Sequence, residues 1–343
     1  MPVTYVYPDS TTLRAIEQDL VPVIEQSDPV FNEIFPVENA DTFKLEWEQL
    51  DNFYGLQAAR GLDGQPSKVA RLGSNRFETE PGIYGEFVDI EEQELVRRAA
   101  IAKFEGVIDI QDLVMQAQRQ LLQRRFDRIR YIGWTLLTTG KFMVAAPNGG
   151  YEHRDQYALE TITASPAFSS RTTATPFSFF LSLLTKGRGT SAKFGPDAKI
   201  YFNAVTIQNI LLNSNAADRA GIRLDYGQTL NKVDDINAIL KGYGLPTIAV
   251  YDEGYLTGSD ASTFVPFIPD SVGVLIGKRT TGTPVGAYRM TINAHNGFQS
   301  GAYTQVFNTY GSEAPGVAKL QVHDGHNGGP VLFFPKACKI LSV

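Results

Sequence analysis

One segment, from Asp51 to Glu86, limits the folds open to this chain more than any other. It is polar, and glycines and prolines recur along it, at Gly55, Gly61, Gly64, Pro66, Gly73, Pro81, Gly82 and Gly85. Structureless loops of this length are uncommon inside compact domains. We therefore predict a two-stranded excursion away from the body, with a turn near Leu62-Asp63-Gly64-Gln65. Because an isolated hairpin is marginal in water, it should lie on another surface.

The pattern of the residues before the excursion indicates an N-terminal arm followed by a strand. Residues 43–50 alternate Phe43, Leu45 and Trp47 with charged side chains, as in a strand with one buried face. Residues 1–46 predict an extended arm with one or two short helices, the first capped by Thr11 or Thr12. Asp28-Pro29 interrupts this arm, and an apolar cluster follows, made of Val30, Phe31, Ile34 and Phe35. We interpret the cluster as an anchor that docks on something else.

A long helix follows the excursion. Apolar residues recur with a period of 3.6 from Gln111 to Ile132, with Asp109 as the expected N-cap. The pattern continues to Leu137 and should end near Gly140. The opposite face carries arginines, which are Arg119, Arg124, Arg125, Arg128 and Arg130.

This arginine face has two interpretations. It is either a solvent face with ion pairs or a docking track for an acidic segment of a neighbouring subunit. Candidate acidic partners are Glu78, Glu80, Glu86 and Asp89. Charge complementarity of this kind sets register more than affinity.

The remaining pattern mixes helices and strands without regular alternation, which predicts an α+β fold. Residues 145–175 resemble a loop. Helices are predicted over 177–184, 204–212 and 233–240, with Thr175-Pro176 opening the first. Strands are predicted over 198–202, 247–251, 272–276, 287–292, 303–309, 318–322, 331–334 and 339–343.

Residues that could carry chemistry are few. The sequence has four histidines, and only His323-Asp324-Gly325-His326 has metal-ligand composition. Its glycines favour a solvated turn between two strands, and no third ligand is evident nearby. Lys186 to Lys193 fails the phosphate-loop pattern and is a flexible basic loop that could touch a neighbour or nucleic acid. We predict no catalytic, cofactor or metal site; a hydrolase with a site near His323 and His326 is the alternative from another class.

Composition narrows the partners and the compartment. The formal net charge is -6, whereas a protein that reads DNA tightly is normally basic. A mildly acidic subunit could still line a container for DNA. Cys338 is the single cysteine, so we expect a buried thiol and no intrachain disulfide. No signal peptide or apolar membrane span is visible, which favours a soluble protein made in the cytoplasm.

The order of these parts resembles the Hong Kong 97-type fold of tailed-phage major capsid proteins. The sequence is most similar to the lambda-type protein E branch of that family. Residues 71–84 (RLGSNRFETEPGIY) resemble that branch's Gly-rich loop and the strand start after it. Residues 245–251 (LPTIAVY) and 267–277 (FIPDSVGVLIG) resemble its strand, loop and P-D-x-x-(V/M)-x-L strand. The similarity of pattern and spacing extends over nearly the whole chain.

The resemblance assigns roles by position. It implies an N-terminal arm (1–46), an extended E-loop overlying an adjacent subunit (47–88), a peripheral or P domain with a spine helix (89–195), an axial or A domain (196–284) and return strands of the P domain (285–343). The candidate inter-subunit contacts are Arg60, Lys68, Arg71, Arg76, Glu78, Glu80, Arg119, Arg124, Arg125 and Arg128.

The resemblance also implies a function in assembly and not in catalysis. Pentamers and hexamers of the chain would close into an icosahedral head that encloses double-stranded DNA, in the virion, after assembly in the host bacterial cytoplasm. The chain carries no fused scaffolding segment with helical heptads. Assembly would therefore use a separate scaffolding protein, unless the chain is already processed. A portal is the other expected partner, and a decoration protein is a further candidate. An encapsulin-like compartment of the same fold is the alternative.

Overall fold

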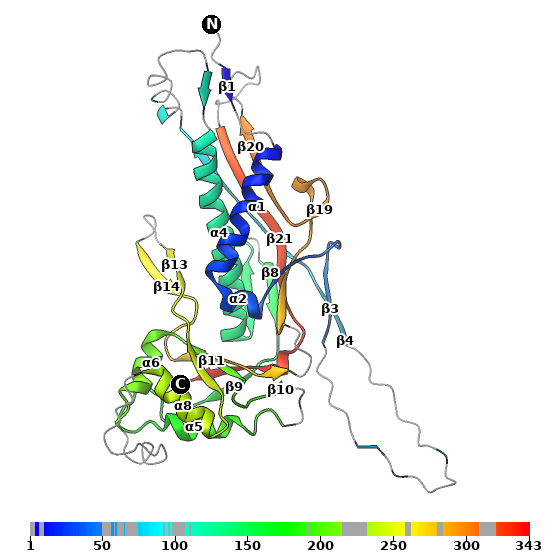
Figure 1. Cartoon of the computed structure of the whole chain (residues 1–343). Coiled ribbons are helices and arrows are strands. Elements are labelled where there is room, and N and C mark those ends of the chain that lie inside the picture. The colour runs from blue at the N-terminus through cyan, green and yellow to red at the C-terminus, as the bar shows by residue number, and fades with distance from the viewer. Residues whose placement is uncertain are drawn as a thin grey trace.

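The computed structural model describes residues 4–6, 10–49, 56–57, 59, 65, 75–91, 93–94, 97, 107–109, 111–147, 149–188, 190, 192–214, 232–257, 262–279, 284–308 and 320–343. Within these ranges the chain mixes helices and strands, as the α+β prediction requires. Figure 1 shows an elongated part built on one long helix and one long strand, above a second part that carries the shorter helices.

The elongated part is a sheet with helices on one face. Its strand order is β2 (Val37–Asn39), β17 (Gly286–Met290), β21 (Leu320–Leu332) and β20 (Ala302–Asn308), and β5 (Gly82–Ile90) also pairs with β21. Helix α4 (Gln111–Thr139) packs along β21 and β5, and α1 (Ser10–Ser27) contacts α4 and β20. At the outer end, β1 (Thr4–Val6) pairs in parallel with β6 (Val107–Asp109).

The second part is a five-stranded sheet with the order β12 (Thr247–Val250), β11 (Lys199–Phe202), β15 (Val272–Ile276), β22 (Cys338–Ser342) and β9 (Glu160–Thr163). Its apolar core includes residues of α5 (Pro176–Leu183), α6 (Ala204–Leu211) and α8 (Val233–Gly242). Small additions complete the fold: β7 (Lys141–Ala145), β8 (Tyr151–Gln156), β10 (Ala192–Lys193), β13 (Gly254–Thr257), β14 (Thr263–Pro266), β16 (Lys278–Arg279), β18 (Ile292–Asn293), β19 (Gln299–Ser300), η1 (Ala294–Asn296) and η2 (Pro335–Ala337).

Helix α4 joins the two parts, as its apolar periodicity allows. Leu113 to Leu121 lie in one core with Leu320 and Val322 of β21. Ile129 to Leu137 lie in a larger core that takes residues from both sheets. The helix ends at Thr139, as predicted, but Asp109 is the last residue of β6 and not the N-cap.

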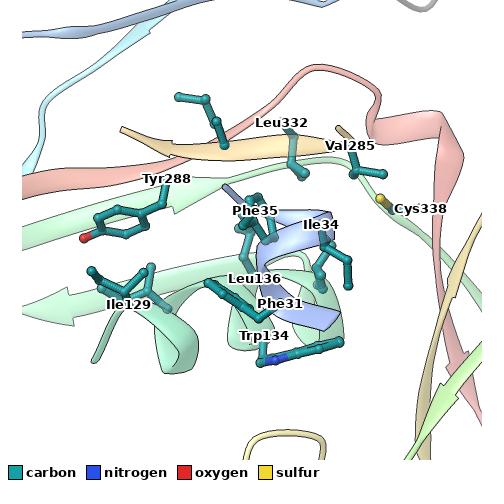
Figure 2. Close-up of a cluster of buried hydrophobic side chains, with 14 of the residues drawn as sticks. Phe31, Ile34, Phe35, Ile129, Trp134, Leu136, Val285, Tyr288, Leu332 and Cys338 are labelled. Carbon is teal, nitrogen blue, oxygen red and sulfur yellow. The ribbon is translucent and has the colours of Figure 1, made fainter. Parts of the chain in front are cut away.

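The N-terminal arm is more helical than the sequence predicted, and its anchor docks on the same chain. Asp28 caps α2 (Pro29–Ile34), because its Oδ1 accepts a hydrogen bond from the Phe31 amide at 3.0 Å. Phe31, Ile34 and Phe35 are buried in the core against Trp134 and Leu136 of α4 (Figure 2). Gly133 of α4 makes room, since a Cβ there would lie 2.7 Å from the Phe31 ring.

The predicted turn at His323–His326 is wrong. These residues lie in the middle of β21, paired with β20 on one side and β5 on the other. Gly325 is not a turn residue but a close-contact residue, since a Cβ there would lie 2.5 Å from the Tyr84 carbonyl and 2.7 Å from the Tyr303 hydroxyl. Glycine in a strand interior often marks such a close approach.

Part of the predicted loop at 145–175 is a hairpin, β7 and β8. The inward side chains of β8 are polar: His153 and Asp155 are both buried, with Nε2 and Oδ2 2.6 Å apart, and the Tyr84 hydroxyl bonds His153 Nδ1. A strand whose buried face is polar lacks the apolar alternation on which strand prediction depends.

Candidate assembly surface

The excursion begins as a hairpin of β3 (Leu45–Gln49) and β4 (Asn75–Thr79), paired from Leu45–Thr79 to Gln49–Asn75. Leu45 and Trp47 are buried as predicted, and Trp47 stacks on Phe77 with ring centroids 5.8 Å apart. Phe43 precedes the strand and is exposed. The predicted turn lies outside the described residues except for Gln65. Gly82 to Glu86 belong to β5 and pair with β21, so the chain rejoins the sheet before the predicted end of the excursion at Glu86.

Ion pairs within the chain stiffen the base of this hairpin. Arg76 pairs with Glu46, and Lys44 Nζ lies 3.1 Å from Glu78 Oε1. Each exposed pair contributes about 0–1 kcal/mol, so their effect is to favour the strand register. Glu80 is exposed beyond the end of β4. Arg60, Lys68 and Arg71 lie outside the described residues.

The arginines of α4 divide into two sets. Arg119, Arg124 and Arg128 are exposed, as predicted. Arg124 Nη2 donates to Glu86 Oε1 at 2.8 Å, and this pairing lowers the pKa of Glu86. The Arg128 guanidinium lies over the Tyr84 and Tyr131 rings at 5.7 and 5.8 Å from their centroids. Glu86, predicted as a partner for the arginine face, therefore meets it within one chain.

Arg125 and Arg130 do not belong to a solvent face, contrary to the prediction. Arg125 is buried between Glu17 of α1 and Asp324 of β21, at 2.6 and 2.8 Å. Arg130 is buried against the end of α1, where its Nη2 donates to the Ile24 carbonyl and to Ser27 Oγ, both at 3.0 Å. Both arginines lie at helical spacing from the buried Leu121, Leu122 and Phe126. The 3.6-residue period of the sequence could therefore have predicted that they are buried.

The sheet face opposite α4 exposes apolar side chains that sequence reasoning missed. Tyr84 and Glu86 of β5 face α4, so the alternate residues Ile83 and Phe87 point away from it, and both are more than half exposed. His323 stacks on Phe87 and packs edge-on to the exposed Phe307, with ring centroids 5.1 and 4.7 Å apart. We call Ile83, Phe87, Phe307 and His323 the aromatic face.

A second exposed apolar pair lies on the β13–β14 hairpin, which projects beside α4 in Figure 1. Leu256 and Phe264 are directly opposite each other in the register, and both are more than half exposed. Tyr255, on the other face, packs edge-on against Tyr131 of α4 at 5.2 Å. The hairpin is thus held to the helix on one side and presents apolar surface on the other.

The histidines of β21 do not form a reactive site. His323 and His326 are three residues apart in one strand, so their side chains lie on opposite faces. His326 is buried with Nε2 2.9 Å from the Tyr288 hydroxyl, and burial lowers its pKa to about 3. Among the described residues, no three His, Cys, Asp or Glu side chains are grouped so that they could hold a metal ion.

Three other predictions concern the basic loop, the cysteine and the membrane. Lys186 Nζ lies 3.1 Å from Glu160 Oε1, so this end of the basic loop is paired within the chain. Cys338 is buried, as predicted. None of the helices within the described ranges combines the length and the apolar character needed to cross a bilayer.

Comparison with known proteins identifies the fold. No protein-family model and no curated sequence matches the chain. Solved structures do match, at low identity. A chain assigned as the capsid protein of a prophage in E. coli CFT073 is 14% identical, with a TM-score of 0.56 over 95% of this chain and 98% of that one.

Two further structures agree. A phage-related protein from Bordetella bronchiseptica RB50 is 10% identical, with a TM-score of 0.52 over 94% of this chain and 96% of that one. The capsid of the myovirus phage XM1 is 12% identical, with a TM-score of 0.50 over 92% of this chain and 91% of that chain. Since these matches extend over nearly the whole chain, the protein has the Hong Kong 97-type fold of phage capsid proteins.

Proposed function

We propose that the chain is a major capsid protein, which assembles into the icosahedral head of a tailed phage. The observation that carries the proposal is the fold, which matches a capsid structure from end to end and not over a shared subdomain. In this proposal the chain acts by contact between subunits and not by catalysis.

In this proposal the segments keep the roles that the sequence suggested. Residues 1–46 form the arm, 47–88 the E-loop, 89–195 and 285–343 the P domain around α4, and 196–284 the A domain. The E-loop lies across a neighbouring subunit, with Arg60, Lys68, Arg71 and Glu80 as candidate contacts. The ion pairs of Arg76 and Glu78 support a stiff base from which the loop reaches outward.

Exposed apolar surface supports self-assembly. The aromatic face and the Leu256–Phe264 pair lie on different elements, so a subunit offers at least two apolar contacts in addition to the excursion. Contacts between unlike surfaces generate rings when the rotation closes, and pentamers and hexamers are such rings. Exposed apolar patches of this kind mark interaction sites.

The remaining partners follow from the same role. A net charge of -6 suits a shell that encloses double-stranded DNA without reading its sequence. In this proposal the partners are a separate scaffolding protein and a portal, with a decoration protein as a further candidate, and the location is the virion after assembly in the host cytoplasm.

Electron microscopy of the purified full-length chain, alone and with its scaffolding protein, tests the proposal. The expected result is closed shells tens of nanometres across, each built from many copies of the subunit. A small oligomer of fixed size under all conditions would overturn it. Particles from infected cells should protect double-stranded DNA from nuclease; a protein cargo in its place would indicate an encapsulin-like compartment.

The hairpin allows a sharper variant. Replacing residues 55–72 by a short Gly/Ser turn keeps β3, β4 and the Trp47–Phe77 stack. The subunit should remain folded, with a thermal midpoint close to that of the parent chain, and should no longer form shells. Normal shells from this variant would refute the proposal that the excursion makes a contact between subunits that assembly requires.

A further inference from the structure

Helix α1 is lightly held to the body. Among its described side chains, Leu13 and Ile24 are the buried apolar ones, while Ile16, Leu20 and Val21 are partly buried and Val23 is exposed. Pro22 lies inside the helix and lacks an amide donor. An element with few buried apolar contacts opens locally at a lower free energy than the rest of a fold.

One buried arginine holds the middle of α1. Arg125 of α4 bridges Glu17 of α1 and Asp324 of β21, and the side chains of Arg125 and Asp324 are 4% and 3% exposed. Thr304 Oγ1 donates to Asp324 Oδ1 at 3.1 Å. The Arg125 Nε–H has no acceptor among the described residues. This bridge confines two carboxylates and one guanidinium, so its electrostatic gain is offset by the cost of desolvating three charges.

The C-terminal end of α1 is fixed more completely. Asp28 accepts from the Phe31 amide at 3.0 Å and from the Tyr251 hydroxyl at 2.5 Å, and lies 3.4 Å from Arg130 Nε. Directly after it, Phe31 and Phe35 are fixed in the core. The chain therefore has a rigid point at Asp28. The helix before it is held by two buried apolar side chains, by the Arg125–Glu17 pair and by one hydrogen bond from Gln118 Nε2 to the Leu13 carbonyl at 2.9 Å.

We propose that α1 is a releasable arm, which pivots at Ser27–Asp28 and is latched to α4 and β21 by the Glu17–Arg125–Asp324 bridge. Its release opens the groove on α4 that Leu13 and Ile24 fill, lined by Leu113, Val114, Ala117, Leu121, Leu122 and Phe126. The inference concerns the single subunit and does not depend on the proposed function.

The raised pKa of Asp324 gives the latch a pH dependence. Burial raises the pKa of Asp324 to about 6; Arg125 opposes this shift and Glu17 adds to it. The charged or titratable groups facing this pair are Arg125 of α4, Glu17 of α1, Glu86 of β5, Tyr303 of β20 and His326 of β21. Release removes Glu17 and part of the cover, so the pKa of Asp324 falls toward 3.8. The docked arm thus binds the proton more tightly, is favoured below about pH 6, and loosens as pH rises through that value.

Hydrogen exchange measured by mass spectrometry on the full-length chain tests the latch, with rates corrected for intrinsic exchange. The protection of α1 amides should fall about tenfold as the pH rises from about 5 to about 8, while that of α2 amides stays constant. Glu17→Gln should lower α1 protection about tenfold across the range, because the tether is lost. Asp324→Asn should keep α1 protected and remove the pH dependence.

The control is Asp19→Asn, which removes the same charge from an exposed position of the same helix. Equal protection in the Glu17 and Asp19 variants would overturn the proposal, as would α1 and α2 losing protection together. Peptides from α2 and α4 report global unfolding in the same experiment. Shells can fail to form while this latch operates, and a rigid α1 would leave the capsid proposal standing.

Discussion

At the scale of single residues, β21 is built around contacts that leave no room for a side chain. Gly325 lies under the Tyr303 hydroxyl and beside the Tyr84 carbonyl, and Gly329 lies against Leu45 and His153. Next to Gly325 on either side, Asp324 and His326 are buried among aromatic rings and Arg125. These close contacts make the centre of β21 sensitive to small changes.

Gly325→Ala should therefore destabilise the subunit by about 1–3 kcal/mol, because the new methyl group overlaps backbone that cannot move aside easily. Thermal or urea unfolding measures the effect. Gly242→Ala is the matched control, since a Cβ there meets nothing within 4 Å at the end of a helix, and it should be neutral or stabilising.

His326 should make the subunit sensitive to acid. Its pKa is about 3 in the folded chain and 6.5 as an ordinary histidine, so the unfolded chain takes up a proton first as the pH falls. Stability is then lost between these values, by up to about 1.4 kcal/mol per pH unit. Asp324 acts in the opposite direction between 3.8 and about 6.

His326→Gln keeps a group that can hydrogen bond to Tyr288 but does not titrate. Urea midpoints measured against pH should fall less steeply below pH 6.5 in the variant than in the parent chain. Parallel curves for the two proteins would show that His326 carries no such linkage.

At the scale of elements, the periodic helices were predictable and the polar strands were not. The prediction for 272–276 agrees with β15, and those for 177–184 and 204–212 agree with α5 and α6 to within a residue or so. β8 and the middle of β21 were missed because histidine, aspartate and glycine fill buried positions there. Such positions are set by tertiary neighbours, which a local pattern does not contain.

The candidate contacts illustrate the same limit. Charge placed Arg125 and Arg130 on the solvent face, whereas the helical period places them with the buried residues. The apolar cluster before Pro36 was correctly interpreted as an anchor. Its docking position on α4 of the same chain, however, depends on Gly133, which is far away in the sequence. An apolar sequence pattern shows that a segment must pack against something, but it does not show which part of the protein it packs against.

The anchor should account for much of the attachment of the arm. Phe35→Ala should cost about 3–5 kcal/mol, since this side chain is fully buried in the main core. Val23→Ala, on an exposed face of α1, should change stability by less than about 0.5 kcal/mol. Equal thermal midpoints for the two variants would contradict the docking of α2.

At the scale of the whole molecule, assembly and folding should depend on different surfaces. Phe87→Ser and Phe264→Ser change exposed side chains of the aromatic face and of the β13–β14 hairpin. Each should leave the subunit folded, with a change within about 1 kcal/mol, and lower the yield of particles about tenfold or more. Sedimentation together with circular dichroism separates the two effects, and normal particle yields from both variants would remove these surfaces from the assembly proposal.

The joint packing of α4 and β21 has a mechanical consequence. Helix and strand run together from the core at Leu113 to the core at Leu137, without a loop between the two ends. Both elements resist extension through continuous hydrogen-bond ladders, so the pair acts as a beam. A load applied near the outer end, such as outward pressure on a filled container, is then carried to the second sheet and is not absorbed by a joint. The subunit is therefore stiffest along the α4–β21 axis. Its flexibility is expected in the segments attached to the sides of that axis.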